Sequence, residues 1–203
     1  MRSTSKLHQF VKSWEPGGRS FVMSDRTWGL PEVVAATLKK TGPATVDVCT
    51  YSTGVETVND CMHAVKSGRA LGFRFLIHNR MVASRTGRGW ASILRRVGAE
   101  NIRAGHTHAK FAIIEAPGWA VSIVTSGNMN ANRALETFAW EEGADRPTIA
   151  TLREHFDEAF RILPELQPPT TALRNDRRAE GKARQASRQP KRKALDDLLG
   201  DLP

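Results

Sequence analysis

The chain has few cysteines and no long apolar run. Of its 203 residues only Cys49 and Cys61 are cysteines, and both lie in segments patterned as regular structure, which favours buried thiols in a reducing cytosol over a disulfide. No apolar run approaches the roughly 20 residues that a bilayer-spanning helix needs. The first residues also lack the apolar stretch of a secretory signal. We therefore expect a cytoplasmic protein without a transmembrane segment.

Acidic residues are scarce in residues 174–193. The chain has 30 Lys and Arg against 21 Asp and Glu, a formal net charge of +9. Residues 174–193 hold nine basic and two acidic residues, so 9 − 2 = +7 of that excess lies in one stretch. With almost no apolar side chains it cannot offset its ordering entropy by burial, which predicts disorder in isolation. Its cations would bind the phosphates of a polyanion. The alternative is that this stretch only keeps the protein soluble. The expected phosphate contacts are Arg174, Arg177, Arg178, Lys191, Arg192 and Lys193.

Turn-forming residues divide the chain into three parts. EPGG and WGLP interrupt residues 1–29, which predicts an arm or a small hairpin. Residues 30–163 alternate strand-like and helix-like segments, which predicts one α/β domain around a mostly parallel or mixed sheet. Residues 164–203 hold a proline-containing linker, the basic tail and a short terminal motif.

The terminal motif, residues 194–203, combines leucines with aspartates. Its four leucines are spaced to form a small apolar face on a short helix, with the aspartates opposite. It would either dock on a protein partner or fold back on the basic run. The residues concerned are Leu195, Leu198, Leu199 and Leu202, with Asp196, Asp197 and Asp201.

The most informative segment is HTHAKFAII, residues 106–114, which alternates polar and apolar residues before an apolar run. This pattern predicts a strand, on which His108 and Lys110 would share one face. Residues 119–125 predict a second strand, followed by a turn of small and amide residues. Ser126, Asn128 and Asn130 in that turn can converge on a ligand.

These residues resemble the phospholipase D superfamily, whose signature is HxKx4D followed by a stretch with glycine, serine and asparagine. HxK is present as His108 and Lys110, Glu115 stands where the family has aspartate, and SGN stands where GSxN is common. Glu136 matches the carboxylate that follows the asparagine. The resemblance covers roughly residues 30–163 and implies an α-β-α sandwich with a mixed sheet.

The resemblance implies phosphodiester chemistry without a metal or another cofactor. His108 can attack phosphorus to give a phosphohistidine, which water then cleaves. Glu136 would hold the other ring N–H of His108, as a triad carboxylate does. Lys110, Ser126 and Asn128 would bind the non-bridging oxygens, and Asn130 would contact substrate. Odd spacing from Lys110 turns Glu115 to the opposite strand face, which predicts a structural role for it.

The family uses a second HxK histidine at the leaving oxygen, and this chain has no second HxK. Four other histidines lack the lysine two positions on: His8, His63, His78 and His155. The resemblance therefore implies a homodimer in which His108 of each subunit meets its own copy across a twofold axis.

Other interpretations of the motif compete with catalysis. A histidine and a lysine two apart on a strand also fit a solvated sheet edge. His106 and His108 could suggest zinc, but no third and fourth ligands appear at metal-site spacing. Three functions stay open: a nuclease acting on DNA, a lipid phosphodiesterase or phosphatidyl transferase, and a non-catalytic nucleic-acid-binding module on the same fold.

Overall fold

The structure is a computed structural model that describes residues 7, 10–24, 26–84, 88–130 and 134–166. The predicted basic tail and the predicted terminal motif, residues 194–203, lie outside the described residues.

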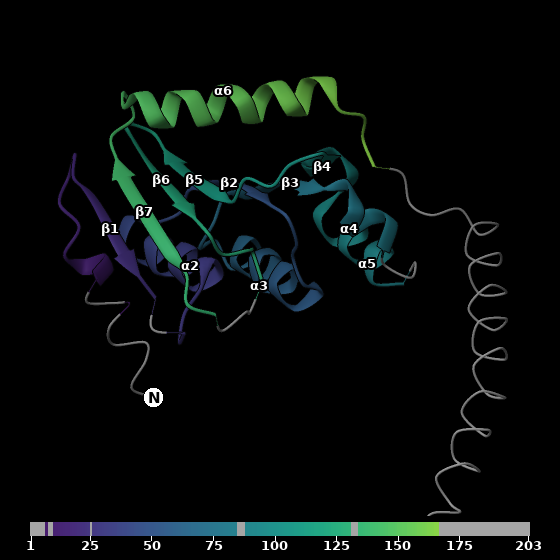
Figure 1. Cartoon of the computed structure of the whole chain (residues 1–203), viewed down its shortest axis with the longest axis horizontal. Helices are drawn as coiled ribbons and strands as arrows, with labels where there is room; N and C mark the ends of the chain where they lie inside the picture. Colours follow the sequence, from purple (N-terminus) through teal and green to yellow (C-terminus); the bar gives the residue numbers. More distant parts are fainter. Residues whose placement is uncertain (1–6, 8–9, 25, 85–87, 131–133, 167–203) are drawn as a thin grey trace, which may run out of the picture. The chain divides into compact units, whose positions relative to one another are not determined.

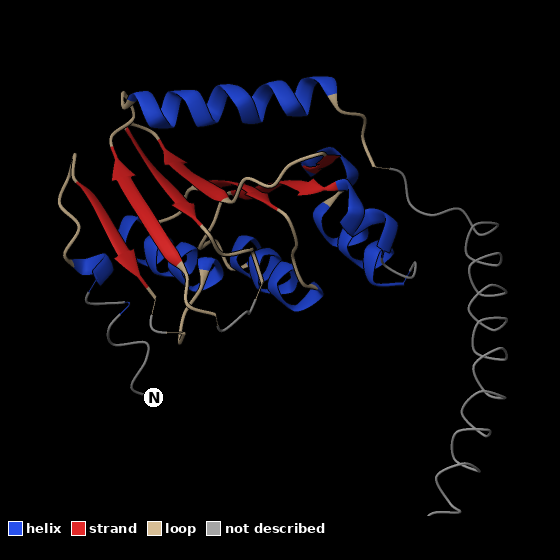
Figure 2. Cartoon of the chain, viewed as in Figure 1, coloured by secondary structure: helices blue, strands red, loops and turns tan. Residues whose placement is uncertain are grey.

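The described residues form a seven-stranded mixed sheet with the order β1-β7-β6-β5-β2-β3-β4 (Figures 1 and 2). Strands β2, β3 and β4 are parallel, and every other neighbouring pair is antiparallel. The strands are β1 (Arg19–Met23), β2 (Thr45–Thr50), β3 (Gly72–His78), β4 (Ile102–Gly105), β5 (Phe111–Ala116), β6 (Trp119–Thr125) and β7 (Thr137–Glu142). The mixed sheet expected from the sequence is confirmed.

Helices cover both faces of this sheet. Figure 1 shows α2 (Leu30–Thr41) and α3 (Val55–Lys66) on one face and α6 (Pro147–Ile162) along the other. Two shorter helices, α4 (Asn79–Ser84) and α5 (Arg88–Val97), and the 3-10 turn Ala99–Asn101 connect β3 to β4. This is the predicted α-β-α sandwich. None of the described helices is long and apolar enough to cross a membrane.

Each face of the sheet buries its own apolar cluster. Successive residues of β5 show the division, because Ile114 belongs to the larger cluster and Ile113 to the smaller one beneath α6. Both side chains are fully buried. The alternation follows from the two-residue period of a strand. It makes β5 a rigid support for the residues that precede it.

Local sequence signals set the limits of several elements. Pro31 lies in the first turn of α2, where its missing N–H removes no helical bond. Gly42 ends that helix with φ 90, a conformation that glycine adopts at low cost. The predicted strand over residues 119–125 coincides with β6.

The strand predicted over residues 106–114 is shorter than expected. It begins at Phe111, although the Lys110 carbonyl still accepts the Thr125 N–H at 2.9 Å. The reason is topological, because β4 lies at the sheet edge whereas β5 lies beside β2. Residues 106–110 must therefore pass the ends of β3 and β2 before the next strand can start.

The described residues of the predicted arm pack against the domain. Strand β1 adds an antiparallel edge to β7. Trp14 packs on Trp140 with ring centroids 4.3 Å apart, and Trp28 packs on Phe138 at 5.0 Å. These two tryptophans are 7% and 6% exposed. The segment thus contributes core side chains as well as an edge strand.

Candidate active site

The predicted site residues gather where the parallel strands end. Strands β2, β3 and β4 finish at Thr50, His78 and Gly105, and His78 pairs in register with Gly105. Because parallel strands bring their carboxyl ends to one sheet edge, the residues that follow them are neighbours. The crossing segment 106–110 adds His108 and Lys110 to this edge.

His108 is exposed, and two other aromatic rings contact its imidazole ring. Its ring lies 4.9 Å from the Tyr51 ring and 5.2 Å from the His78 ring, centroid to centroid, and meets His78 edge-on. Lys110 Nζ donates to the carbonyl oxygen of His108 at 3.0 Å. The cation is therefore held beside the histidine by the crossing segment itself.

Ser126 and Glu136 form a second part of the site. Ser126 Oγ donates a hydrogen bond to Glu136 Oε2 and accepts the Thr137 N–H at 3.0 Å. Ser24 Oγ in turn accepts the Glu136 N–H at 3.0 Å. The antiparallel pairing of β6 and β7 explains this contact, since one strand ends where the other begins. Glu136 makes no hydrogen bond to His108 among the described residues, so its orienting role remains a prediction.

The turn after β6 is held against the loop after β2. Thr50 Oγ1 accepts the Met129 N–H at 2.9 Å. It has two possible acceptors for its own proton, the Ser52 carbonyl at 3.0 Å and Asn128 Oδ1 at 3.4 Å. Asn130 Nδ2 donates to Ser52 Oγ at 3.1 Å. The predicted amide ligands Asn128 and Asn130 are thus positioned by the end of β2 and the loop after it, which are far from them in sequence.

His78 is a buried member of the site that the sequence did not identify. It is 1% exposed, and its Nδ1 accepts the Arg80 N–H at 3.0 Å. A neutral ring therefore carries its proton on Nε2. Burial lowers the pKa of His78, and the nearby His106, His108 and Arg80 lower it further. The available signal was a histidine at the end of an apolar strand.

Glu115 lies apart from these groups. Its carboxylate pairs with the Arg153 guanidinium of α6, towards the end of β5 that is farther from His108. In this position Glu115 links the sheet to the covering helix.

Both cysteines are buried and free, and Cys49 lies beneath the crossing segment. Its Sγ is 3.4 Å from Thr107 Oγ1 and 3.6 Å from the Ala109 carbonyl oxygen. Burial raises the pKa of the Cys49 thiol. A protonated thiol in this place can donate to the segment that carries His108.

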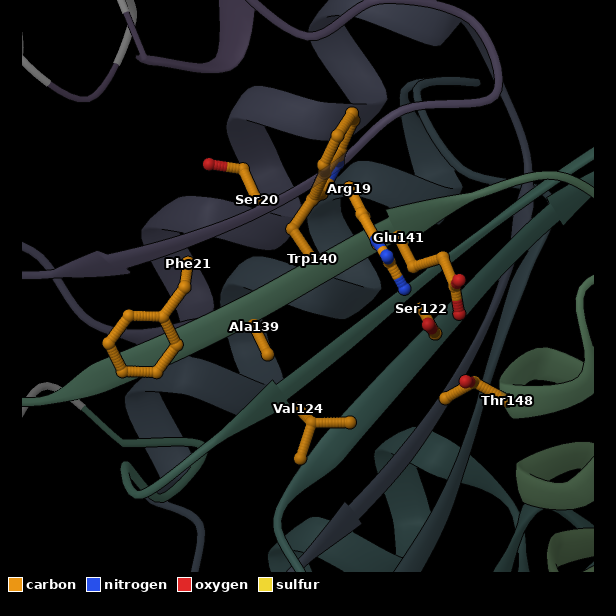
Figure 3. A pocket seen from close by; sticks show the side chains of 9 residues that line it. All are labelled: Arg19, Ser20, Phe21, Ser122, Val124, Ala139, Trp140, Glu141 and Thr148. Carbon is orange, nitrogen blue, oxygen red and sulfur yellow. The ribbon is translucent and has the colours of Figure 1, made fainter.

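A separate cavity of about 420 Å³ lies on the sheet beside β1, β6 and β7 (Figure 3). Exposed Phe21 and the Arg19 and Glu141 side chains line it, and none of the predicted site residues does. Within the described ranges no three His, Cys, Asp or Glu side chains are grouped so that they could hold a metal ion.

Comparison with known proteins relies on structure. No protein-family model matches the chain, and no curated protein matches its sequence. The crystal structure of the phospholipase D family member Nuc from Salmonella typhimurium superimposes with a TM-score of 0.53 and 16% identity, over 74% of this chain and 98% of that one. The chain has a phospholipase D-like fold.

Two further structures share this phospholipase D-like fold. NucT from Helicobacter pylori gives a TM-score of 0.50 and 12% identity over 73% of this chain and 99% of that one. Polyphosphate kinase from Porphyromonas gingivalis gives 0.50 and 13% over 75% of this chain but only 27% of its own length. The predicted fold class is thereby confirmed, and at these identities the likeness concerns the fold.

Proposed function

We propose that the protein is a metal-independent phosphodiesterase, a nuclease that cleaves DNA through a phosphohistidine intermediate. One observation carries the proposal: His108 is exposed at the strand-end edge of a phospholipase D-like sheet, and the Lys110 ammonium is hydrogen-bonded to the backbone carbonyl of the same residue. Imidazole is a nucleophile at neutral pH, and a preorganised cation stabilises the charge that develops on the phosphoryl oxygens.

The reaction has two displacements. In the first, a ring nitrogen of His108 forms a bond to phosphorus while the bond from phosphorus to the leaving oxygen breaks. In the second, water attacks phosphorus and the N–P bond breaks, which restores His108 and releases the phosphate end. The Lys110 ammonium neutralises the negative charge on the non-bridging oxygens in both steps. The hydroxyl of Ser126 and the amide of Asn128 are further ligands of these oxygens. No atom changes its oxidation state in this scheme, and the scheme needs no metal.

The leaving oxygen requires a proton, and we assign it to His108 of the partner subunit in a homodimer. The support is geometric: the Tyr51 and His78 rings contact the His108 ring, and His108 is nevertheless exposed. An isologous twofold interface brings a residue near the axis to its own copy. The site would then consist of two equal halves.

The basic tail, residues 174–193, supports a polyanionic substrate. Its excess of +7 is the largest concentration of charge in the sequence. Contacts between such cations and a phosphate backbone hold the strand without reading its bases. The tail thus favours DNA over a single lipid headgroup.

The decisive experiment compares the full chain with His108→Ala in excess EDTA. The substrates are plasmid, single-stranded DNA, RNA, labelled phospholipid and a small chromogenic diester. We expect cleavage of nucleic acid in EDTA and at least about a thousandfold loss in His108→Ala. Acid-quenched protein should carry phosphate on histidine. Loss of cleavage in EDTA would contradict the metal-independent scheme.

The same assay separates the competing functions. Turnover of phospholipid alone would favour a lipid phosphodiesterase, and DNA binding unchanged in His108→Ala without any turnover would favour a binding module.

Mixing equal amounts of the unaltered protein and His108→Ala tests whether two subunits share one site. If both copies of His108 are needed, only the unaltered homodimers are active, and random exchange leaves roughly a quarter of the activity of the same total amount of unaltered protein. If the subunits act independently, roughly a half remains.

A further inference from the structure

We propose that Arg80 and His106 form a second phosphate subsite, which holds the phosphate next to the cleaved one on a polynucleotide. The inference rests on the proposed function and names the class of substrate: a chain of phosphodiesters rather than a molecule with a single one.

Both residues are tied to the same buried ring that supports His108. The His106 ring lies 4.9 Å from the His78 ring, and His108 lies 5.2 Å from it. The backbone N–H of Arg80 donates to Nδ1 of His78 at 3.0 Å. Because His78 is buried, it fixes the backbone of Arg80 and the two histidine rings relative to one another. Arg80 and His106 are both exposed, so a ligand can reach them.

The charge of Arg80 is not used within the described structure. Its guanidinium has no carboxylate partner among the described residues. Five other arginines each pair with a carboxylate: Arg74, Arg103, Arg146, Arg153 and Arg161. The positive charge nevertheless acts on the site, since it contributes, after burial and the two other histidines, to the lowered pKa of His78. A guanidinium without a carboxylate partner is a ready anion ligand.

A phosphate other than the cleaved one fits this position. Lys110 already lies beside His108, where the reacting phosphoryl group would bind. Arg80 is attached to the site through its backbone N–H, which donates to Nδ1 of His78, and its charge acts on the His78 ring. Successive phosphates on one strand advance by about 3.4 Å along a duplex axis. A nucleic-acid strand that crosses the edge where β2, β3 and β4 end, with one phosphate at His108, therefore brings a neighbouring phosphate towards Arg80 and His106. Guanidinium and imidazole N–H groups together suit its oxygens.

The test compares Arg80→Ala, Arg80→Lys and His106→Ala on two substrates, a short oligothymidylate and bis(p-nitrophenyl) phosphate. Arg69→Ala is the matched control, because Arg69 is exposed and lies in the turn before β3, at the opposite end of the strand from His78. We expect Arg80→Ala to raise KM for the oligonucleotide by about tenfold relative to its effect on the small diester. Arg80→Lys should recover part of this loss, and His106→Ala should cause a smaller rise.

Salt dependence gives a second measurement. Loss of one phosphate contact should reduce the slope of log KM against log salt by about 0.7 for single-stranded DNA. Equal effects of Arg80→Ala on both substrates would overturn the inference, because Arg80 would then act at the cleaved phosphate. Equal KM values and slopes in Arg80→Ala, Arg69→Ala and the unaltered protein would also overturn it.

Binding separates this inference from the proposed function. If the unaltered protein hydrolyses neither substrate, the proposed activity fails, while fluorescence anisotropy of the labelled oligothymidylate still tests the subsite. Weaker binding in Arg80→Ala but not in Arg69→Ala would support it. Weaker binding to phosphatidylglycerol vesicles, with the oligonucleotide unaffected, would overturn it in favour of a lipid surface.

Discussion

Two buried threonines, Thr50 at the end of β2 and Thr53 in the loop after it, should respond in opposite ways to the same isosteric substitution. Thr50 Oγ1 accepts the Met129 N–H and faces the Asn128 carboxamide oxygen. Thr53 is equally buried, at 1% exposed, but its Oγ1 has no hydrogen-bond partner among the described residues. Replacing each by valine keeps the volume and removes the hydroxyl. The contrast isolates the hydrogen bonds that hold the turn after β6.

The magnitudes follow from what each hydroxyl does. Thr50→Val leaves a buried N–H without an acceptor, which costs about 1–3 kcal/mol of the free energy of unfolding. Thr53→Val removes a hydroxyl that is buried and unpaired, so the free energy of unfolding should rise by about 1 kcal/mol. The two variants should therefore differ by about 2–4 kcal/mol.

Urea titration measures both changes. The midpoints can be compared when the free energy of unfolding falls with urea concentration at the same slope in both variants. Thr50→Val also frees Asn128, and we expect kcat on the small diester to fall about tenfold, while Thr53→Val keeps its kcat. Equal destabilisation by both valines would refute the assignment of Thr50 as the residue that fixes this turn.

Two further predictions concern the carboxylate and the tail. A Cβ on Gly127 would lie 3.1 Å from Glu136 Cδ, so Gly127→Ala should displace the carboxylate from Ser126 and lower kcat several-fold. Gly72→Ala, whose Cβ has no neighbour within 4 Å, is the control, and equal rates would contradict the role of Glu136. Deletion of residues 170–203 should weaken DNA binding and reduce its salt slope, with hydrolysis of the small diester retained. Unchanged salt slopes would exclude the tail from DNA binding.

Much of the fold was predictable because its signals are local. Pro31 and Gly42 mark the ends of α2, and the apolar run 119–125 marks β6. Strand β1 was not found, since its five residues follow a glycine pair and only one of their side chains, Val22, is even partly buried. Trp14 and Trp28 carry no periodic pattern. Their burial depends on partners in β7 that are more than a hundred residues away.

The site was predictable in its residue types but not in its supports. The HxK pair and the serine and amide turn follow from spacing, whereas the grouping of Tyr51, His78 and His108 depends on the sheet order. Residues 106–110 pass over β3 and β2 only because β4 is the edge strand. An intervening helical connection, α4 and α5, sets that order, and a one-dimensional pattern does not encode it.

His78 connects the two proposals made for this site. Its ring is buried and its Nδ1 is occupied by the Arg80 N–H, so it has no free acceptor for the proton on another histidine. It can therefore support His108 but cannot accept a proton through Nδ1 without breaking the link to Arg80. In the proposed homodimer the proton for the leaving oxygen comes instead from His108 of the partner subunit, which an isologous interface brings to the exposed His108 of the first.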